Sequence, residues 1–315
     1  MAQMPWTNHT SITKFILLGF GNLNEVQILL FVVFLVIYIV TLGGNLLIVA
    51  LVVADQQLHT PMYFFLGNLS FLETCYTSVS VPRLLYGLLV EDRTISFRDC
   101  ITQLFFLSAL ACIECFLLAV MAYDRYLAIC NPLSYNVMMN LGVCLQMVSA
   151  SWITGFSATA LVVGMVPQLS FCSSNEINNF FCDMEELLKL SCTKSSLVEM
   201  IVLLSCSLVT LAPFLFIVVS YIHILLAILR IAYSAERQKA FSTCASHLLV
   251  VSLYYGTIII MYVVPSAERS PAFHKVLSVM YTVITPMFNP IIYSLRNKEV
   301  KEAFRKVVLQ NLGMV

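Results

Sequence analysis

Charged side chains are scarce in this sequence. Only 17 Lys and Arg and 17 Asp and Glu occur among 315 residues, or 11% of the chain, whereas soluble globular domains average about 25%. So few charges cannot cover a water-soluble protein of this length, which argues against a soluble enzyme and a disordered protein. The formal net charge is zero. The chain therefore has no positive excess with which to bind nucleic acid.

Two further absences narrow the function. The five histidines are scattered, and no nucleophile, base and orienting group stand in a recognisable catalytic set, so we expect no enzyme. No internal repeat is visible, which argues weakly against a transporter built from inverted repeats.

Long apolar runs are what the sequence has in abundance, since 60% of its residues are hydrophobic. A helix needs about 20 mostly apolar residues to cross a bilayer, and a membrane barrel needs short alternating segments instead. Five runs carry no charge and two carry isolated charges, Glu73 and Arg83 in one and Glu114 in the other; they span residues 27–54, 62–90, 101–123, 141–167, 200–229, 240–267 and 276–295. We therefore predict an all-α membrane protein, a bundle of seven transmembrane helices.

The chain divides into an N-terminal segment (1–25), the seven-helix domain (26–296) and a tail (297–315). Residues 1–6 lack the basic stretch of a cleaved signal peptide, so we expect the first span to act as its own anchor. The tail places apolar residues at helical spacing among basic ones. This pattern predicts a short basic amphipathic helix on the inner membrane surface, although a frayed tail is the alternative. The apolar positions are Val300, Phe304, Val307 and Val308.

The density of basic residues and the positions of the cysteines indicate how the chain is oriented in the membrane. With the N-terminus outside, the Lys and Arg counts on the two faces nearly balance, but five of the inner ones lie between Arg296 and Lys306. Four cysteines, which allow three pairings, lie at or near the long loop after the fourth span: Cys100, Cys172, Cys182 and Cys192. Disulfides need an oxidising compartment, so we expect that face and the N-terminus to be extracellular, in the plasma membrane. Asn8 begins a glycosylation sequon on that side, whereas the sequon at Asn68 lies inside a span.

Several motifs occur in a fixed order along the chain: FILLGF at 15–20, LHTPMYFFL at 58–66, MAYDRYLAIC at 121–130, KAFSTCASHL at 239–248 and PMFNPIIYSLRN at 286–297, with Gly44-Asn45 in the first span and Trp152 in the fourth. In these motifs the sequence closely resembles the olfactory (odorant) receptors, a group of rhodopsin-like G-protein-coupled receptors, over nearly its whole length. No long extracellular insertion typical of fish-like receptors is present, so it resembles the tetrapod-enriched class.

The resemblance implies a coupling role for residues at the inner ends of the spans. Asp124 and Arg125 form a neighbour pair that can hold itself neutral, and opening it would expose a guanidinium with five donors to the cytoplasm; interfacial snorkelling is the alternative. The family's pattern makes Arg125 the residue that meets the G protein once the sixth span moves outward. Pro213 and Pro290 each delete a helical hydrogen bond and offer bend points. The implied coupling and switch set is Asp124, Arg125, Tyr126, Tyr221, His247, Asn289, Pro290 and Tyr293.

Glu73 and Glu114 fall at mid-membrane depth. Glu73 lies about 18 Å along its helix from Pro61, and Glu114 about 15 Å from Asp124. Two carboxylates in one pocket repel, so they share a proton or hold a cation. The resemblance implies a sodium ion, although Glu73 stands where the family usually has Asp. Protonated carboxyl groups and an ion pathway remain the alternatives, and we expect no other cofactor.

The resemblance also implies the disulfides Cys100–Cys182 and Cys172–Cys192. The other seven cysteines are expected to be small apolar residues. In the family, a metal role for the long loop depends on a His ahead of the Phe-Phe-Cys-Asp run. Asn179 occupies that position here, and because Asn is a poor ligand for soft metals, copper or zinc is not expected through it.

The ligand pocket is expected between the outer halves of the third, fifth, sixth and seventh spans. Helical spacing picks their inward faces, and bundle packing is the alternative role of each residue. The predicted pocket is mostly apolar, and Leu107 stands where amine receptors carry Asp, so it suits a small neutral volatile molecule. Its residues are Leu104, Leu107, Ser108, Ala111, Cys112, Val202, Ser205, Cys206, Val209, Tyr255, Ile258, Ile259, Tyr262, Val279 and Thr282.

Together these patterns predict an odorant receptor that activates a stimulatory heterotrimeric G protein and the cAMP pathway. Its partners would be a volatile odorant, the G protein and the lipid bilayer, without nucleic acid. Two alternatives stay open: the same scaffold sensing a non-olfactory ligand, and an ion-coupled transporter or channel using Glu73 and Glu114.

Overall fold

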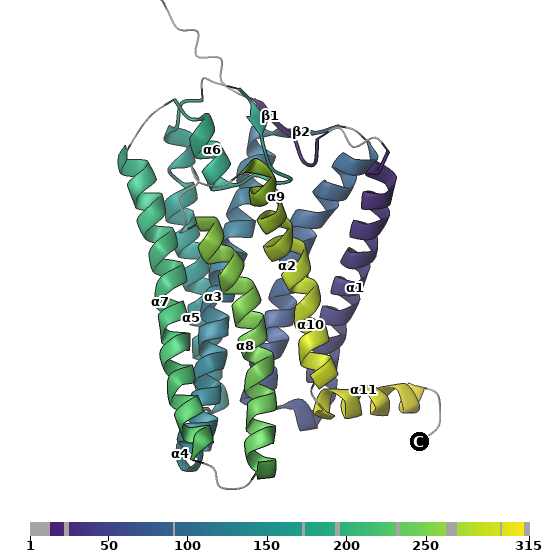
Figure 1. The fold of residues 1–315 in the computed structure, drawn as a ribbon, viewed down its shortest axis with the longest axis vertical. Helices are drawn as coiled ribbons and strands as arrows, with labels where there is room; N and C mark the ends of the chain where they lie inside the picture. The colour runs from purple at the N-terminus through teal and green to yellow at the C-terminus, as the bar shows by residue number, and fades with distance from the viewer. Residues whose placement is uncertain are drawn as a thin grey trace, which may run out of the picture.

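The computed structural model describes residues 13–21, 25–90, 92–171, 174–192, 196–230, 234–262, 270–296 and 298–311, with only the backbone at a few of these positions. Seven helical spans stand side by side in one bundle (Figure 1). They are α1 (Gln27–Ala54), α2 (Pro61–Leu89), α3 (Phe97–Cys130), α5 (Leu141–Val163), α7 (Ser196–Leu229), α8 (Ser234–Tyr262) and a seventh span composed of α9 (Pro271–Val279), η4 (Met280–Ile284) and α10 (Thr285–Arg296). The predicted fold class, a seven-helix membrane bundle, is confirmed.

The second span differs from the others in polarity. Six spans of the described chain are long and apolar enough to cross a bilayer by composition alone, and α2 is not among them. Its 29 residues still measure about 43 Å, more than a bilayer core of about 30 Å. Its hydroxyl groups bond back to the helix itself, as when Thr77 Oγ1 donates to the carbonyl of Glu73 at 2.8 Å. The helix thereby satisfies its own polar groups in lipid.

Local sequence signals set where the helices begin. Ser96 accepts a hydrogen bond from the amide of Asp99 at 3.1 Å at the start of α3, and Asn140 does the same for Val143 at 3.0 Å in α5. Pro61 and Pro271 open α2 and α9, where the missing N–H costs nothing. These caps explain why α3 begins four residues before the apolar run at 101–123.

One end of the bundle carries a small sheet, and we call it the sheet end (Figure 1). β1 (Lys14–Leu17) lies in the middle, antiparallel to β2 (Thr94–Ser96) and parallel to β3 (Glu176–Ile177). Phe15 pairs with Ile95, and Ile16 pairs with both Thr94 and Glu176. A short turn, η2 (Val166–Gln168), and helix α6 (Met184–Leu190) complete this end.

The opposite end, the α11 end, carries η1 (Gln56–Leu58), α4 (Pro132–Met138) and α11 (Lys298–Asn311). Figure 1 shows α11 lying across the end of the bundle, at a steep angle to α10. The predicted tail helix therefore forms. Val300 and Ala303 are buried against α1 and α2, whereas the Phe304 side chain is exposed. The side chains of Val307 and Val308 lie outside the described residues.

Apolar side chains lie both inside the bundle and on its outside. The central cluster joins α2, α3, α7, α8 and the seventh span, and includes Leu72, Ile113 and Tyr254. The outer faces of α1, α5 and α7 also expose large apolar side chains, among them Ile28, Leu161 and Leu208 at 78%, 76% and 70%. Such a belt would aggregate in water, and it fits a lipid environment.

Candidate functional site

A cavity opens in the half of the bundle nearer the sheet end. It leaves about 100 Å³ of space for water-sized molecules, within about 730 Å³ free of protein atoms that includes open solvent. Its walls come from α3, α5, α7, α8 and the segment at the start of α6, and most are apolar or weakly polar. The lining residues are Ser108, Ala111, Cys112, Cys115, Ala158, Thr159, Val162, Val163, Asp183, Met184, Ser205, Cys206, Val209, Thr210, Tyr254 and Ile258.

The polar groups of this wall are few, and some are already engaged. Tyr254 Oη donates to the carbonyl of Ala111 at 2.6 Å, and Thr159 Oγ1 lies 3.8 Å from Cys112 Sγ. Asp183 brings a buried carboxylate to the cavity from the loop. The cavity can therefore hold an apolar body and orient a small number of polar atoms.

The mid-membrane carboxyl groups meet in the core. Glu73, Glu114 and Asn289 are all buried, and the amide of Asn289 donates to Glu73 Oε1. The side chains of Glu73 and Glu114 lie close enough to share a hydrogen bond. Three buried oxygens here have no hydrogen-bond donor, Glu73 Oε2, Glu114 Oε1 and Asn289 Oδ1. Such a group of oxygens suits a proton or a hard cation.

Asp124 and Arg125 form the predicted neighbour pair near the α11 end. Arg125 donates to Asp124 Oδ2 from Nε at 3.1 Å and from a terminal nitrogen at 2.5 Å, and Tyr135 Oη of α4 donates to Oδ1 at 2.8 Å. Only 1% of the Asp124 side chain is exposed, against 15% for Arg125. Burial and the neighbouring carboxylate of Asp124 raise the pKa of Tyr135, so its hydroxyl stays a donor. The guanidinium of Arg125 is therefore held by the neighbouring carboxylate of Asp124 in the same chain.

The remaining predicted switch residues make contacts in several parts of the bundle. Tyr221 Oη is 2.7 Å from His247 Nδ1, which joins α7 to α8, and the two rings stack at 5.6 Å. Tyr126 packs edge-on against His223. Pro290 lies against Gly44, where an added Cβ would come within 3.1 Å of the proline ring. Tyr293 Oη is buried and makes no hydrogen bond.

At the sheet end, the loop after α5 is tied to α3. Cys100 and Cys182 form a disulfide with an S–S distance of 2.02 Å, which confirms that prediction. Cys192 is also disulfide-bonded, and its amide donates to the carbonyl of Ser170 at 2.8 Å. Cys172 lies outside the described residues, so the pairing Cys172–Cys192 stays a prediction. Asn8 also lies outside them.

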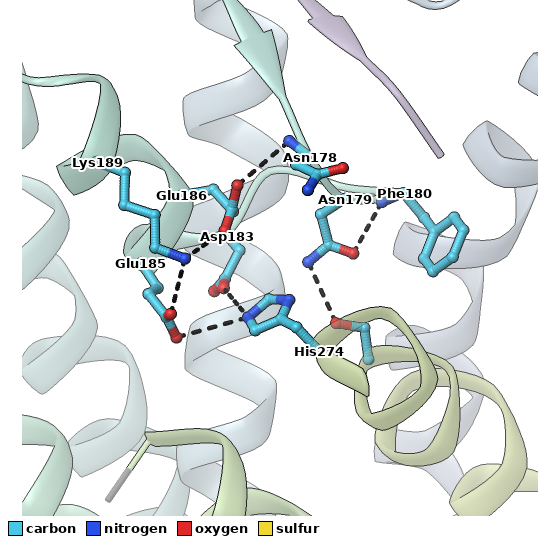
Figure 2. A network of polar contacts seen from close by, with 9 residues as sticks. Asn178, Asn179, Phe180, Asp183, Glu185, Glu186, Lys189 and His274 are labelled. Carbon is cyan, nitrogen blue, oxygen red and sulfur yellow. Dashed lines mark hydrogen bonds and ion pairs between the residues drawn. The ribbon is translucent and has the colours of Figure 1, made fainter. Parts of the chain in front are cut away.

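Figure 2 shows a polar network between this loop and the seventh span. His274 of α9 points toward Asp183 and Glu185, and Lys189 pairs with Glu185 at 2.9 Å and Glu186 at 2.7 Å. Partial burial lowers the pKa of Lys189, but these two ion pairs outweigh it and raise the pKa overall. Asn179 donates from Nδ2 to Ser278 Oγ at 3.2 Å.

Known proteins resemble this chain over nearly its whole length. A family model described as "Olfactory receptor" matches residues 34–311. Human olfactory receptor 11L1 is 50% identical, with 98% of this chain and 96% of that protein covered. Human olfactory receptor 10A7 is also 50% identical, with 97% and 96% covered, and mouse olfactory receptor 5AP2 is 48% identical, with 96% and 95% covered. The chain belongs to the olfactory receptor family. It is therefore an odorant-sensing G-protein-coupled receptor rather than a transporter or channel, and a receptor rather than an enzyme.

In this olfactory receptor, the structure brings about half of the predicted pocket residues to the cavity. Ser108, Ala111, Cys112, Ser205, Cys206, Val209 and Ile258 line it. Leu104 and Val202 are buried in the apolar cluster at the sheet end, and Leu107 is buried in the central cluster. Tyr255 Oη donates to the carbonyl of Cys115 at 2.9 Å. Ile259 and Val279 pack against the central cluster, and the Tyr262 side chain lies outside the described residues.

Among the described residues, none of the seventh span lines the cavity, although Val279 and Thr282 were predicted there. Its η4 segment is π-helical, and Tyr281, Thr282 and Val283 are buried there. Thr282 Oγ1 donates to the carbonyl of Ser278 at 2.6 Å, and Tyr281 meets Phe181 edge-on at 6.1 Å. The seventh span therefore packs against the loop at Tyr281, next in sequence to the predicted contact Thr282.

The fourth span and the loop supply wall residues that the sequence pattern missed. Gly155 of α5 lies so close to α3 that an added Cβ would come within 2.4 Å of Ile113. This approach brings Ala158, Thr159 and Val162 to the cavity. The small residues of α5 permit close helix packing in membranes. They are the feature of the sequence from which these wall residues could have been predicted.

Proposed function

We propose that this receptor binds small, mostly apolar volatile molecules in the cavity between α3, α5, α7 and α8. Binding activates a stimulatory heterotrimeric G protein, which raises cAMP. The cavity carries this proposal, because its mostly apolar wall with a few polar atoms matches a small neutral ligand. We place the receptor in the plasma membrane with its N-terminus and the sheet end extracellular.

The proposed coupling to the G protein depends on residues near the α11 end of the bundle. Arg125 is partly exposed near the α11 end and held by Asp124, so a rearrangement that separates the pair frees five donors for a partner protein. Tyr221 and His247 join α7 to α8 beside it. A displacement of α8 would break that contact, so the cavity wall and the coupling surface share a moving element.

Sodium at Glu73, Glu114 and Asn289 is a further part of the proposal. The three undonated buried oxygens support it, since hard cations take oxygen ligands. Bound sodium would offset the carboxylate charge. Glu73 and Asn289 would then tie α2 to α10 in the resting arrangement through their hydrogen bond.

The experiment is a cAMP reporter screen of cells expressing the receptor against a chemically broad panel of volatiles. Two matched variants of α5 test the cavity. Ala158→Phe fills it, because Ala158 lines the wall, and should raise the half-maximal agonist concentration about tenfold or more.

Ala160→Phe adds the same ring two residues away, at an exposed position, and should leave the response unchanged. Equal responses of Ala158→Phe and Ala160→Phe, at equal surface expression, would show that the ligand does not bind in this cavity.

A further inference from the structure

Helix α6 and the seventh span bring three metal-ligating side chains together at the sheet end. One ligand atom each from Asp183, Glu185 and His274 lies within 4.8 Å of the other two. His274 Nε2 is 3.5 Å from Glu185 Oε2 and 3.8 Å from Asp183 Oδ2 (Figure 2). The three side chains converge from two elements far apart in sequence.

These separations suit zinc. In a tetrahedral site with bonds of about 2.0–2.1 Å, ligand atoms lie about 3.3 Å apart. Both contacts of the imidazole are therefore within about 0.5 Å of the separation that a bound ion requires. Imidazole nitrogen with carboxylate oxygens is a common zinc ligand set. Magnesium prefers octahedral oxygen ligands and keeps its waters.

The imidazole supplies an independent sign of a ligand. His274 is 5% exposed and its Nε2 makes no hydrogen bond, yet it points between the two carboxyl groups (Figure 2). At 3.5 and 3.8 Å both contacts are at or beyond hydrogen-bonding reach. A metal ion between these atoms would satisfy the nitrogen.

The charge of the cluster points the same way. Asp183 and Glu185 bring two carboxylates to His274, and one divalent cation would match the two negative charges that they carry when ionised. Lys189 contacts Glu185 through Oε1, whereas the oxygen nearest to His274 is Oε2, so the ion pair and the metal do not compete for one atom.

We propose that Asp183, Glu185 and His274 bind a zinc ion that links α6 to α9. The site does not use residue 179, whose amide bonds Ser278 instead. Asp183 also lines the cavity, so the metal ties a part of the cavity wall to the seventh span.

The test is the thermal stability of the purified full-length receptor in detergent without odorant, with and without zinc. A ligand that binds only the folded state raises the melting temperature by mass action, here by about 5 °C at a hundredfold excess over the dissociation constant. Magnesium should give no shift. Because no odorant is used, failure of this test is separate from failure of the proposed ligand cavity.

His274→Asn and Glu185→Gln should each abolish the zinc shift, measured against the variant's own metal-free baseline. Glu186→Gln on the same helix and His223→Asn on exposed α7 surface should keep it. Metal analysis after dialysis should find one zinc per wild-type receptor and none in His274→Asn. An absent shift in wild type, or an equal shift in wild type and both site variants, would overturn the proposal.

Discussion

Two carboxylates in this bundle differ in how their oxygens are hydrogen-bonded. Asp124 has partners on both oxygens, since Arg125 donates to one and Tyr135 to the other. Glu73 has one oxygen bonded by Asn289 and one without a donor. Asp124 therefore holds the guanidinium of Arg125 in place, whereas Glu73 keeps one oxygen able to accept a proton or an ion.

Arg125→Ala should leave folding intact and abolish agonist-driven cAMP. Arg125 lies beside Asp124 near the α11 end, which we propose is cytoplasmic, and Ala removes its five donors. Surface expression by flow cytometry and cAMP dose response check this. Arg230→Ala, an exposed position at the end of α7, is the control and should signal normally. Full signalling by Arg125→Ala at a normal surface level would contradict a role of Arg125 in coupling to the G protein.

Glu73→Gln or Glu114→Gln should change basal activity and make agonist potency insensitive to sodium. Each change removes a charge while keeping the volume, so an ion that favours the resting arrangement loses its site. Agonist dose responses in membranes, with sodium and with N-methylglucamine, measure this.

The wild type is the decisive control for the sodium site. Its potency should be lower with sodium than with N-methylglucamine, because an ion shifts a conformational balance only by its differential affinity. Equal wild-type potency in the two salts would leave a protonated carboxyl pair as the better account.

At the scale of elements, the seventh span shows how polar contacts set helix geometry. Its π-helical segment η4 has Thr285 Oγ1 donating to the carbonyl of Met280 at 3.0 Å, and Pro290 follows. Asn45 of α1 donates to the carbonyl of Pro286 at 3.2 Å. A side chain of the seventh span itself and one from neighbouring α1 therefore satisfy backbone groups that an ideal helix would have bonded itself, as lipid requires.

The disulfide between α3 and the loop is the other element-scale constraint. Cys100→Ser or Cys182→Ser should block surface expression, because a long loop loses its tether; losing a native disulfide costs about 2–5 kcal/mol in small secreted domains. Surface staining of intact cells measures it. Cys75→Ser, at a free and half-buried cysteine of α2, should express normally. Wild-type staining in both disulfide variants would argue against the tether.

At the scale of the whole molecule, the two ends differ in chemistry. The sheet end has the disulfide, the strands and the acidic loop helix, whereas the α11 end has the Asp124–Arg125 pair and α11. Lys306 reaches Asp55 at 3.5 Å, and Tyr63 Oη donates to Glu299 at 2.5 Å, so α11 is attached to the first two spans. This asymmetry supports the proposed orientation.

Asn8→Gln should abolish a glycosidase-sensitive shift of the receptor on gels. β1 begins at Lys14 on the sheet end, which we propose is extracellular, so we expect the sequon that precedes it in the sequence to be accessible to glycosylation. Asn68→Gln is the matched control, because Asn68 lies within α2 and donates to the carbonyl of Phe64 at 2.8 Å. A shift lost in Asn68→Gln, or absent in the wild type, would contradict this orientation.

The sequence by itself determined the spans, because runs of apolar residues have few other ways to satisfy their backbones in lipid. It also determined the disulfide Cys100–Cys182 through family resemblance, and the Asp124–Arg125 pair, whose partners are neighbours in the chain. Local caps such as Ser96 and Asn140 could also have been read from it.

The cavity and the cluster of Asp183, Glu185 and His274 were decided only by tertiary structure. Helical periodicity separates apolar from polar faces, but in this chain nearly every face is apolar, so it cannot tell a lipid-facing residue from a cavity residue. Close packing of Gly155 against α3 places α5 beside the cavity, and none of the described residues of the seventh span joins the cavity wall. His274 meets Asp183 only because the loop folds back over the bundle, a contact between distant segments that no local pattern encodes.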